Sequence, residues 1–69
     1  MVTLRRFTGA EWRDLARGIR HLIRQDEEGI ERNKKTTVEQ QFVRSRELHE
    51  EMLELCELYA KRAEKAGRP

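Results

Sequence analysis

His49 is the first residue to test for chemistry, because it stands among carboxylates in the run Leu48-His49-Glu50-Glu51-Met52. A zinc protease helix needs a second histidine four residues further on, and position 53 is leucine. A di-metal carboxylate site needs a glutamate three residues before the histidine, where Arg46 stands. We therefore interpret His49 as a histidine at the edge of a hydrophobic core. His21 is expected on the solvent side of its helix.

Cys56 is the single cysteine, so the chain cannot form an internal disulfide. Together with His21 and His49 it also falls short of the roughly four ligands of a structural zinc site. Its place on an apolar stripe, with no basic neighbour in sequence, predicts a small buried hydrophobe rather than a nucleophile. The chain has no glycine-rich phosphate loop and no Ser-His-Asp set. We expect no catalytic residue, no metal, no cofactor and no small-molecule substrate.

A row of arginines is the strongest candidate for a charged functional surface. Its members recur at three- and four-residue steps and would follow one side of a helix: Arg13, Arg17, Arg20 and Arg24. Such a row can track phosphates, which makes nucleic-acid binding the alternative function. No aromatic residues are interleaved with it, and a matching row of carboxylates can neutralise it: Glu47, Glu50, Glu54 and Glu57. Nucleic-acid binding is therefore not favoured.

The first helix is predicted to span residues 9–32, after an extended lead-in over 1–8. Thr8 and Glu11 have the spacing of a capping box, and Phe7 and Trp12 have that of a hydrophobic staple. Apolar residues then recur with helical spacing: Trp12, Leu15, Ala16, Ile19, Leu22, Ile23 and Ile30.

The second helix is predicted to span residues 38–65, after a turn over 33–37 that contains no apolar residue. Thr36 with Glu39, or Thr37 with Gln40, could cap it. Its core positions alternate by four and three residues: Val38, Phe42, Ser45, His49, Met52, Cys56, Tyr59 and Ala63. One continuous helix is the competing interpretation. The first helix's heptads, carried forward, fall mostly on polar residues, so a break is favoured.

The predicted fold is all-α, an antiparallel hairpin of two helices in a single domain of 69 residues. A turn centred near residue 35 brings together positions whose numbers sum to about 70. This register predicts the ion pairs Arg13–Glu57, Arg17–Glu54, Arg20–Glu50 and Arg24–Glu47. It also predicts the core contacts Trp12–Tyr59, Leu15–Cys56, Ile19–Met52 and Ile30–Phe42, with Asp26 next to Arg44 or Ser45.

One broad side of this hairpin is predicted to be apolar and uncovered. Its residues are Leu15, Gly18, Leu22, Leu48, Met52, Leu55 and Tyr59. Gly18 and Gly29 would allow a close backbone approach there, or are simply tolerated weak points of the helix. Two copies meeting on this side would form a four-helix bundle, and one copy could equally dock on a larger protein. We therefore expect a homodimer, an adaptor or a regulator.

Composition sets the remaining limits. Charged residues make up 41% of the chain, aromatic residues 6%, and the net charge is only +2. No stretch approaches the roughly 20 apolar residues that a membrane span needs, and the first residues do not resemble a secretion signal. With one thiol and no partner for it, a cytoplasmic location is expected.

Overall fold

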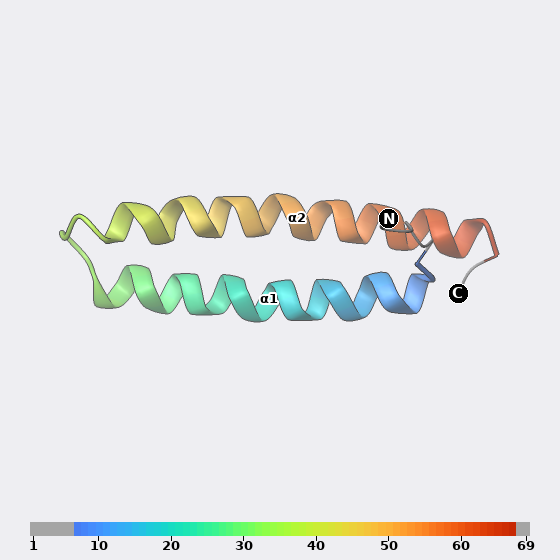
Figure 1. Ribbon diagram of the computed structural model, residues 1–69, viewed down its shortest axis with the longest axis horizontal. Helices are drawn as coiled ribbons and strands as arrows, with labels where there is room; N and C mark the ends of the chain where they lie inside the picture. The colour runs from blue at the N-terminus through green and yellow to red at the C-terminus, as the bar shows by residue number, and fades with distance from the viewer. Residues whose placement is uncertain (1–6, 68–69) are drawn as a thin grey trace, which may run out of the picture.

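The computed structural model describes residues 7–67 as two long helices lying antiparallel and side by side (Figure 1). Helix α1 spans Gly9–Arg32 and helix α2 spans Glu39–Lys65. The predicted all-α hairpin is therefore confirmed. Most of the extended lead-in predicted for residues 1–8 lies outside the described residues.

The start of α1 follows the predicted capping box. The Thr8 hydroxyl accepts a hydrogen bond from the Glu11 amide at 3.2 Å, and a Glu11 carboxylate oxygen accepts one from the Thr8 amide at 3.0 Å. The Phe7 and Trp12 rings meet edge to face with centroids 4.9 Å apart. These contacts satisfy amides that the first helical turn leaves without partners, and they fix the entry of the chain into α1.

The turn between the helices is closed by backbone and side-chain hydrogen bonds. The Asn33 side-chain amide donates to the Gly29 carbonyl at 2.8 Å, which satisfies an acceptor at the end of α1. Lys35 adopts the left-handed conformation, with φ of 66°. Its amide donates to the Glu39 carboxylate at 2.6 Å, so the first residue of α2 anchors the turn.

The predicted threonine cap of α2 is wrong. Val38 occupies the N-cap position, where no side chain caps the helix by a hydrogen bond. The Thr36 hydroxyl instead donates backwards, to the Asn33 carbonyl at 2.6 Å. The left-handed Lys35 brings Thr36 over the end of α1, so its hydroxyl stabilises the turn rather than the start of α2.

The seam between the helices is built from small side chains. Its buried apolar residues are Ala16, Ile19, Cys56, Ala60 and Ala63. Three partly buried residues pack against this core: Trp12, Ile23 and Leu53. Within the described range, no large side chain is fully buried. Small residues at a helix–helix contact let the two backbones approach closely.

The seam on α2 differs in part from the predicted four-three alternation. Met52 and Tyr59 were expected in it, but 40% and 39% of their surfaces are exposed. Ala60 is completely buried in their place, and Leu53 packs against the core cluster. The closest approach of the helices follows the smallest side chains, which turns the bulkier Met52 and Tyr59 out to one side.

Candidate interaction surface

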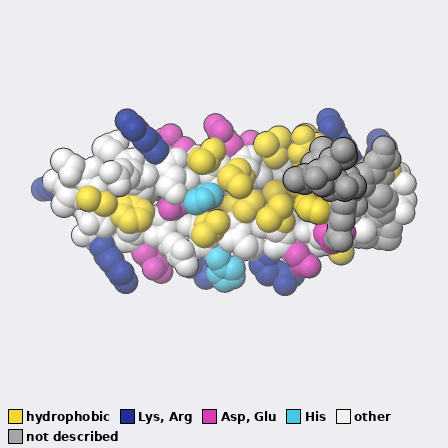
Figure 2. Space-filling view, in the orientation of Figure 1, with side chains coloured by type: hydrophobic (Ala, Val, Ile, Leu, Met, Phe, Trp, Pro, Cys, Tyr) yellow, Lys and Arg dark blue, Asp and Glu magenta, His cyan; other side chains and the backbone are white. Residues whose placement is uncertain are grey.

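One side of the hairpin collects the large apolar side chains that the seam does not bury. We call this surface the apolar face and define it by six residues, each 39% to 57% exposed: Leu15, Leu22, Leu48, Met52, Leu55 and Tyr59. Figure 2 shows yellow hydrophobic side chains running along the middle of the molecule over both helices, with charged groups along the two margins. The face is thus contributed jointly by α1 and α2.

Helical geometry explains why these residues share one side. At about 100° per residue, Leu48, Met52 and Leu55 fall within an arc of roughly 60° on α2. This arc lies to one side of the seam that contains Cys56 and Ala60. In an antiparallel pair, equivalent flanks of the two helices meet, so the α1 flank carrying Leu22 joins the same surface.

Gly18 and Gly29, inside α1, play different roles. A β-carbon at Gly29 would lie 2.5 Å from the Phe42 ring, so this glycine gives the ring a place to pack. A β-carbon at Gly18 would meet nothing within 4 Å. Of these two glycines, Gly29 is required for a close approach, while Gly18 leaves bare backbone near the edge of the apolar face.

Asp26 and His49 form a polar contact inside the seam. Asp26 is 6% exposed, and its Oδ2 lies 2.7 Å from His49 Nδ1. Ser45 Oγ lies 3.5 Å from the same ring nitrogen. The predicted partner of Asp26, Arg44 or Ser45, is therefore wrong, because the carboxylate contacts His49, and Ser45 approaches the His49 ring instead. A carboxylate buried in this seam needs such a partner to offset its lost hydration.

The arginine row is largely paired with carboxylates, but in a register that differs from the predicted one. Arg13 pairs with Glu64 at 2.7 Å, and Arg20 pairs with Glu57 at 2.8 Å. The expected pairs Arg13–Glu57 and Arg20–Glu50 are thus wrong by one heptad each.

The direction of helical side chains explains this shift. Side chains lean towards the N-terminus of their own helix, so in antiparallel helices two residues at the same height lean apart. Arg13 and Glu64 are offset by about six residues, or roughly 9 Å, and lean towards each other. Asp26 and His49 are offset in the same sense. Trp12 and Tyr59, by contrast, lie level and stack with centroids 5.1 Å apart, as predicted.

The other two arginines also depart from the predicted pairs. Arg17 approaches Asp14 of its own helix at 3.9 Å rather than Glu54. Arg24 forms no ion pair within residues 7–67, so its expected pair with Glu47 is absent there. The expected match of four arginines with four glutamates is therefore reduced to two cross-helix ion pairs.

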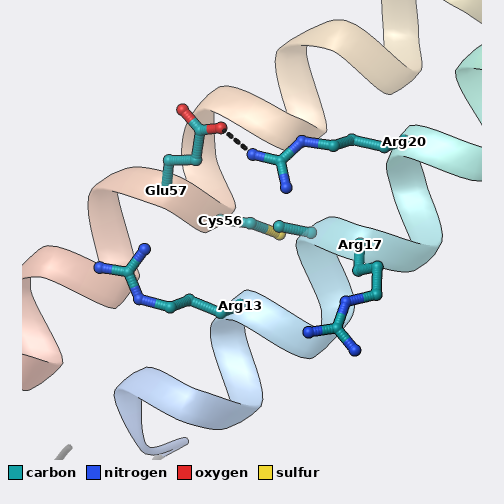
Figure 3. Close-up of a pocket in the computed structure, with 6 residues that line it drawn as sticks. Arg13, Arg17, Arg20, Cys56 and Glu57 are labelled. Atoms are coloured by element: carbon teal, nitrogen blue, oxygen red, sulfur yellow. Dashed lines mark hydrogen bonds and ion pairs between the residues drawn. The ribbon is translucent and has the colours of Figure 1, made fainter.

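A small cavity of about 210 Å³ opens beside these ion pairs (Figure 3). It is lined by Arg13, Ala16, Arg17, Arg20, Cys56 and Glu57. Figure 3 shows the Glu57 carboxylate reaching across to Arg20, with Cys56 between the two helices. Burial, and secondly the charge of Glu57, raises the pKa of the Cys56 thiol. The thiol therefore stays protonated at neutral pH, which agrees with its expected role as a small hydrophobe.

An aromatic and charged cluster marks the open end of the hairpin. The Arg62 guanidinium lies over the Tyr59 ring, 5.8 Å from its centroid. On the α1 side of the apolar face, an open hollow of about 560 Å³ is lined by Phe7, Glu11, Asp14 and Leu15. This end of the face thus has a cationic margin on α2 and an acidic margin on α1.

Comparison of the chain with protein-family models, with curated proteins and with solved structures finds no match. Within residues 7–67, no group of three or more His, Cys, Asp or Glu side chains is placed to hold a metal ion. Neither helix in this range has the length and apolar character that crossing a membrane requires.

Proposed function

We propose that this chain is a non-enzymatic protein–protein interaction module that associates with a second copy of itself through the apolar face. The observation that carries the proposal is the distribution of side-chain size. Small residues such as Ala60 fill the seam, while Leu22, Leu55 and their neighbours stand in solvent. A stable helical domain covers its large apolar side chains with a second layer of structure, and a single hairpin has only one layer.

The dimensions of the molecule support the proposal that a second layer of helices covers the apolar face. Its Cα trace extends only 13 Å along the shortest axis, against 48 Å and 27 Å along the others. The chain exposes 5847 Å², whereas a compact protein of this mass exposes about 4,600 Å². The excess exceeds the roughly 800 Å² that each partner buries in an interface of standard size. A second copy, facing the first, would complete a four-helix bundle.

The free energy gained by burying the apolar face is large for so small a chain. At about 25 cal/mol per Å² of apolar surface, burying several leucines and a tyrosine contributes several kcal/mol. Small domains have a total stability of about 5 to 15 kcal/mol, so association would supply a major part of it. The low net charge of +2 opposes self-association only weakly.

No observation favours the alternative, a nucleic-acid-binding regulator. Arg13 and Arg20 already have carboxylate partners on α2, and Arg17 approaches Asp14. A phosphate would have to compete with these carboxylates at three of the four arginines.

The proposal is tested by replacing apolar residues with glutamate and measuring molar mass by sedimentation equilibrium. Leu22→Glu and Leu55→Glu place a charge within the apolar face, so we expect each to shift the chain from dimer towards monomer and to lower the melting temperature. Leu58→Glu is the matched control. Leu58 is 43% exposed, like the others. It lies opposite the seam and about 90° around α2 from the centre of the apolar face, so it is outside the proposed interface.

Circular dichroism shows that each variant is still helical at the concentration used. We expect Leu58→Glu to keep the wild-type mass. A wild-type mass that both Leu22→Glu and Leu55→Glu leave unchanged would contradict the proposal.

A further inference from the structure

The two margins of the apolar face carry opposite charges at the open end of the hairpin. On α2, Arg62 lies over Tyr59. On α1, Glu11 and Asp14 line the open hollow beside Leu15. The Glu11 carboxylate accepts a hydrogen bond from the Thr8 amide at 3.0 Å, and Asp14 pairs with Arg17 of its own helix at 3.9 Å. The hollow thus has two apolar lining residues, Phe7 and Leu15, and two acidic ones, Glu11 and Asp14.

Two arrangements of a second copy on the apolar face differ in which margins meet. If the turns of both copies lie at opposite ends, α2 packs against α2, and α1 against α1. The middle of α2 then meets its own copy, which brings Glu51, at the margin of the apolar face beside Leu48 and Leu55, close to Glu51 of the second copy. Like charges across an interface oppose this arrangement.

If the turns lie at the same end, α1 of each copy packs against α2 of the other. The cationic margin of one copy then faces the acidic hollow of the other, once on each side of the two-fold axis. In this arrangement the neighbouring helices are antiparallel and level with each other, as they are within one hairpin. The offset between Asp14 and Arg62 is nearly the same as between Arg13 and Glu64, so their side chains lean towards each other.

We infer that the chain dimerises with both turns at the same end, and that Arg62 of each copy enters the hollow formed by Phe7, Glu11, Asp14 and Leu15 of the other. The arginine stem covers apolar surface there, and its guanidinium reaches the carboxylates. This inference rests on the proposed self-association through the apolar face. It adds the orientation of the two copies and the residues that select it.

Charge reversal in separate copies tests this contact. Arg62→Glu alone, or Asp14→Arg alone, places like charges together at both symmetry-related contacts. We expect each variant to dimerise roughly tenfold more weakly than wild type at low salt. When the two variants are mixed in equal amounts, a heterodimer has opposite charges at both contacts. We expect this mixture to recover an affinity close to that of wild type.

The matched control is Lys61→Glu, which makes the same charge change at an exposed position directed away from the apolar face. We expect it to dimerise like wild type. Its heterodimer with Asp14→Arg keeps a like-charge contact on one side of the two-fold axis, so we expect it to bind more weakly than the heterodimer of Arg62→Glu with Asp14→Arg. Sedimentation equilibrium of each variant and mixture, at low and high salt, gives the dissociation constants. The losses should shrink at high salt, because exposed charges are screened.

The outcomes separate this inference from the proposed function. A dimer that is lost in Leu22→Glu and Leu55→Glu, but that shows no recovery in the mixture, would overturn the orientation and leave the proposed function in place. A wild-type chain that stays monomeric at every concentration would overturn both.

Discussion

Asp26 of α1 and His49 of α2 meet at 2.7 Å within a seam that is otherwise lined mainly by apolar side chains. The contact joins residues on opposite helices and is offset along the hairpin, like the ion pair between Arg13 and Glu64. A polar pair at one position of an apolar seam penalises sliding of the helices, because any other register would leave both groups buried without partners.

Replacing one member of this pair should lower the free energy of unfolding more than replacing both. We expect Asp26→Leu or His49→Leu to lower the free energy of unfolding by about 1 to 3 kcal/mol, since each leaves a polar group in the seam without its partner. The double variant Asp26→Leu/His49→Leu should recover most of this loss. Urea denaturation of the four proteins at one concentration measures the coupling. Additive losses would show that the two side chains do not stabilise each other.

Gly18 and Gly29 of α1 should respond in opposite ways to replacement by alanine. Gly29→Ala would push a methyl group into the Phe42 ring, and overpacking of this kind costs about 1 to 3 kcal/mol. That cost exceeds the roughly 1 kcal/mol gained in helix propensity. Gly18→Ala meets no atom of the hairpin and should stabilise it by about 1 kcal/mol. Urea denaturation compares them, and a gain in stability for Gly29→Ala would mean that Phe42 does not pack there.

The ion pair between Arg13 and Glu64 should make stability depend on acid pH. A hydrogen bond from Arg13 holds the pKa of Glu64 below its ordinary value of 4.5. A carboxyl group whose pKa is lower in the folded state adds stability above its unfolded pKa, and this contribution disappears as the pH falls through the folded value. We therefore expect the urea midpoint to fall as the pH drops below about 4.5.

Glu64→Gln should flatten this part of the pH profile, and only modestly, because the pair is exposed to solvent. Glu54→Gln provides the control, as Glu54 forms no ion pair within residues 7–67. Identical pH profiles for wild type and Glu64→Gln would show that the ion pair does not contribute to stability.

The two helices, and the apolar side of each, follow from local sequence patterns. The capping box at Thr8, the polar turn and the three- and four-residue spacing act over short distances, so they can be read without knowing the fold. The apolar face was predictable for the same reason: Leu22 and Leu55 lie on equivalent flanks of their helices whatever the exact register.

Which residues meet across the seam depends instead on how the two helices pack together. The size of side chains set the closest approach of the helices, so Ala60 is buried and Met52 faces outwards. The lean of long side chains along each helix moved Arg13 from Glu57 to Glu64 and brought Asp26 to His49. Both effects depend on how two helices fit together in three dimensions, which residue numbers and helical angles alone do not specify.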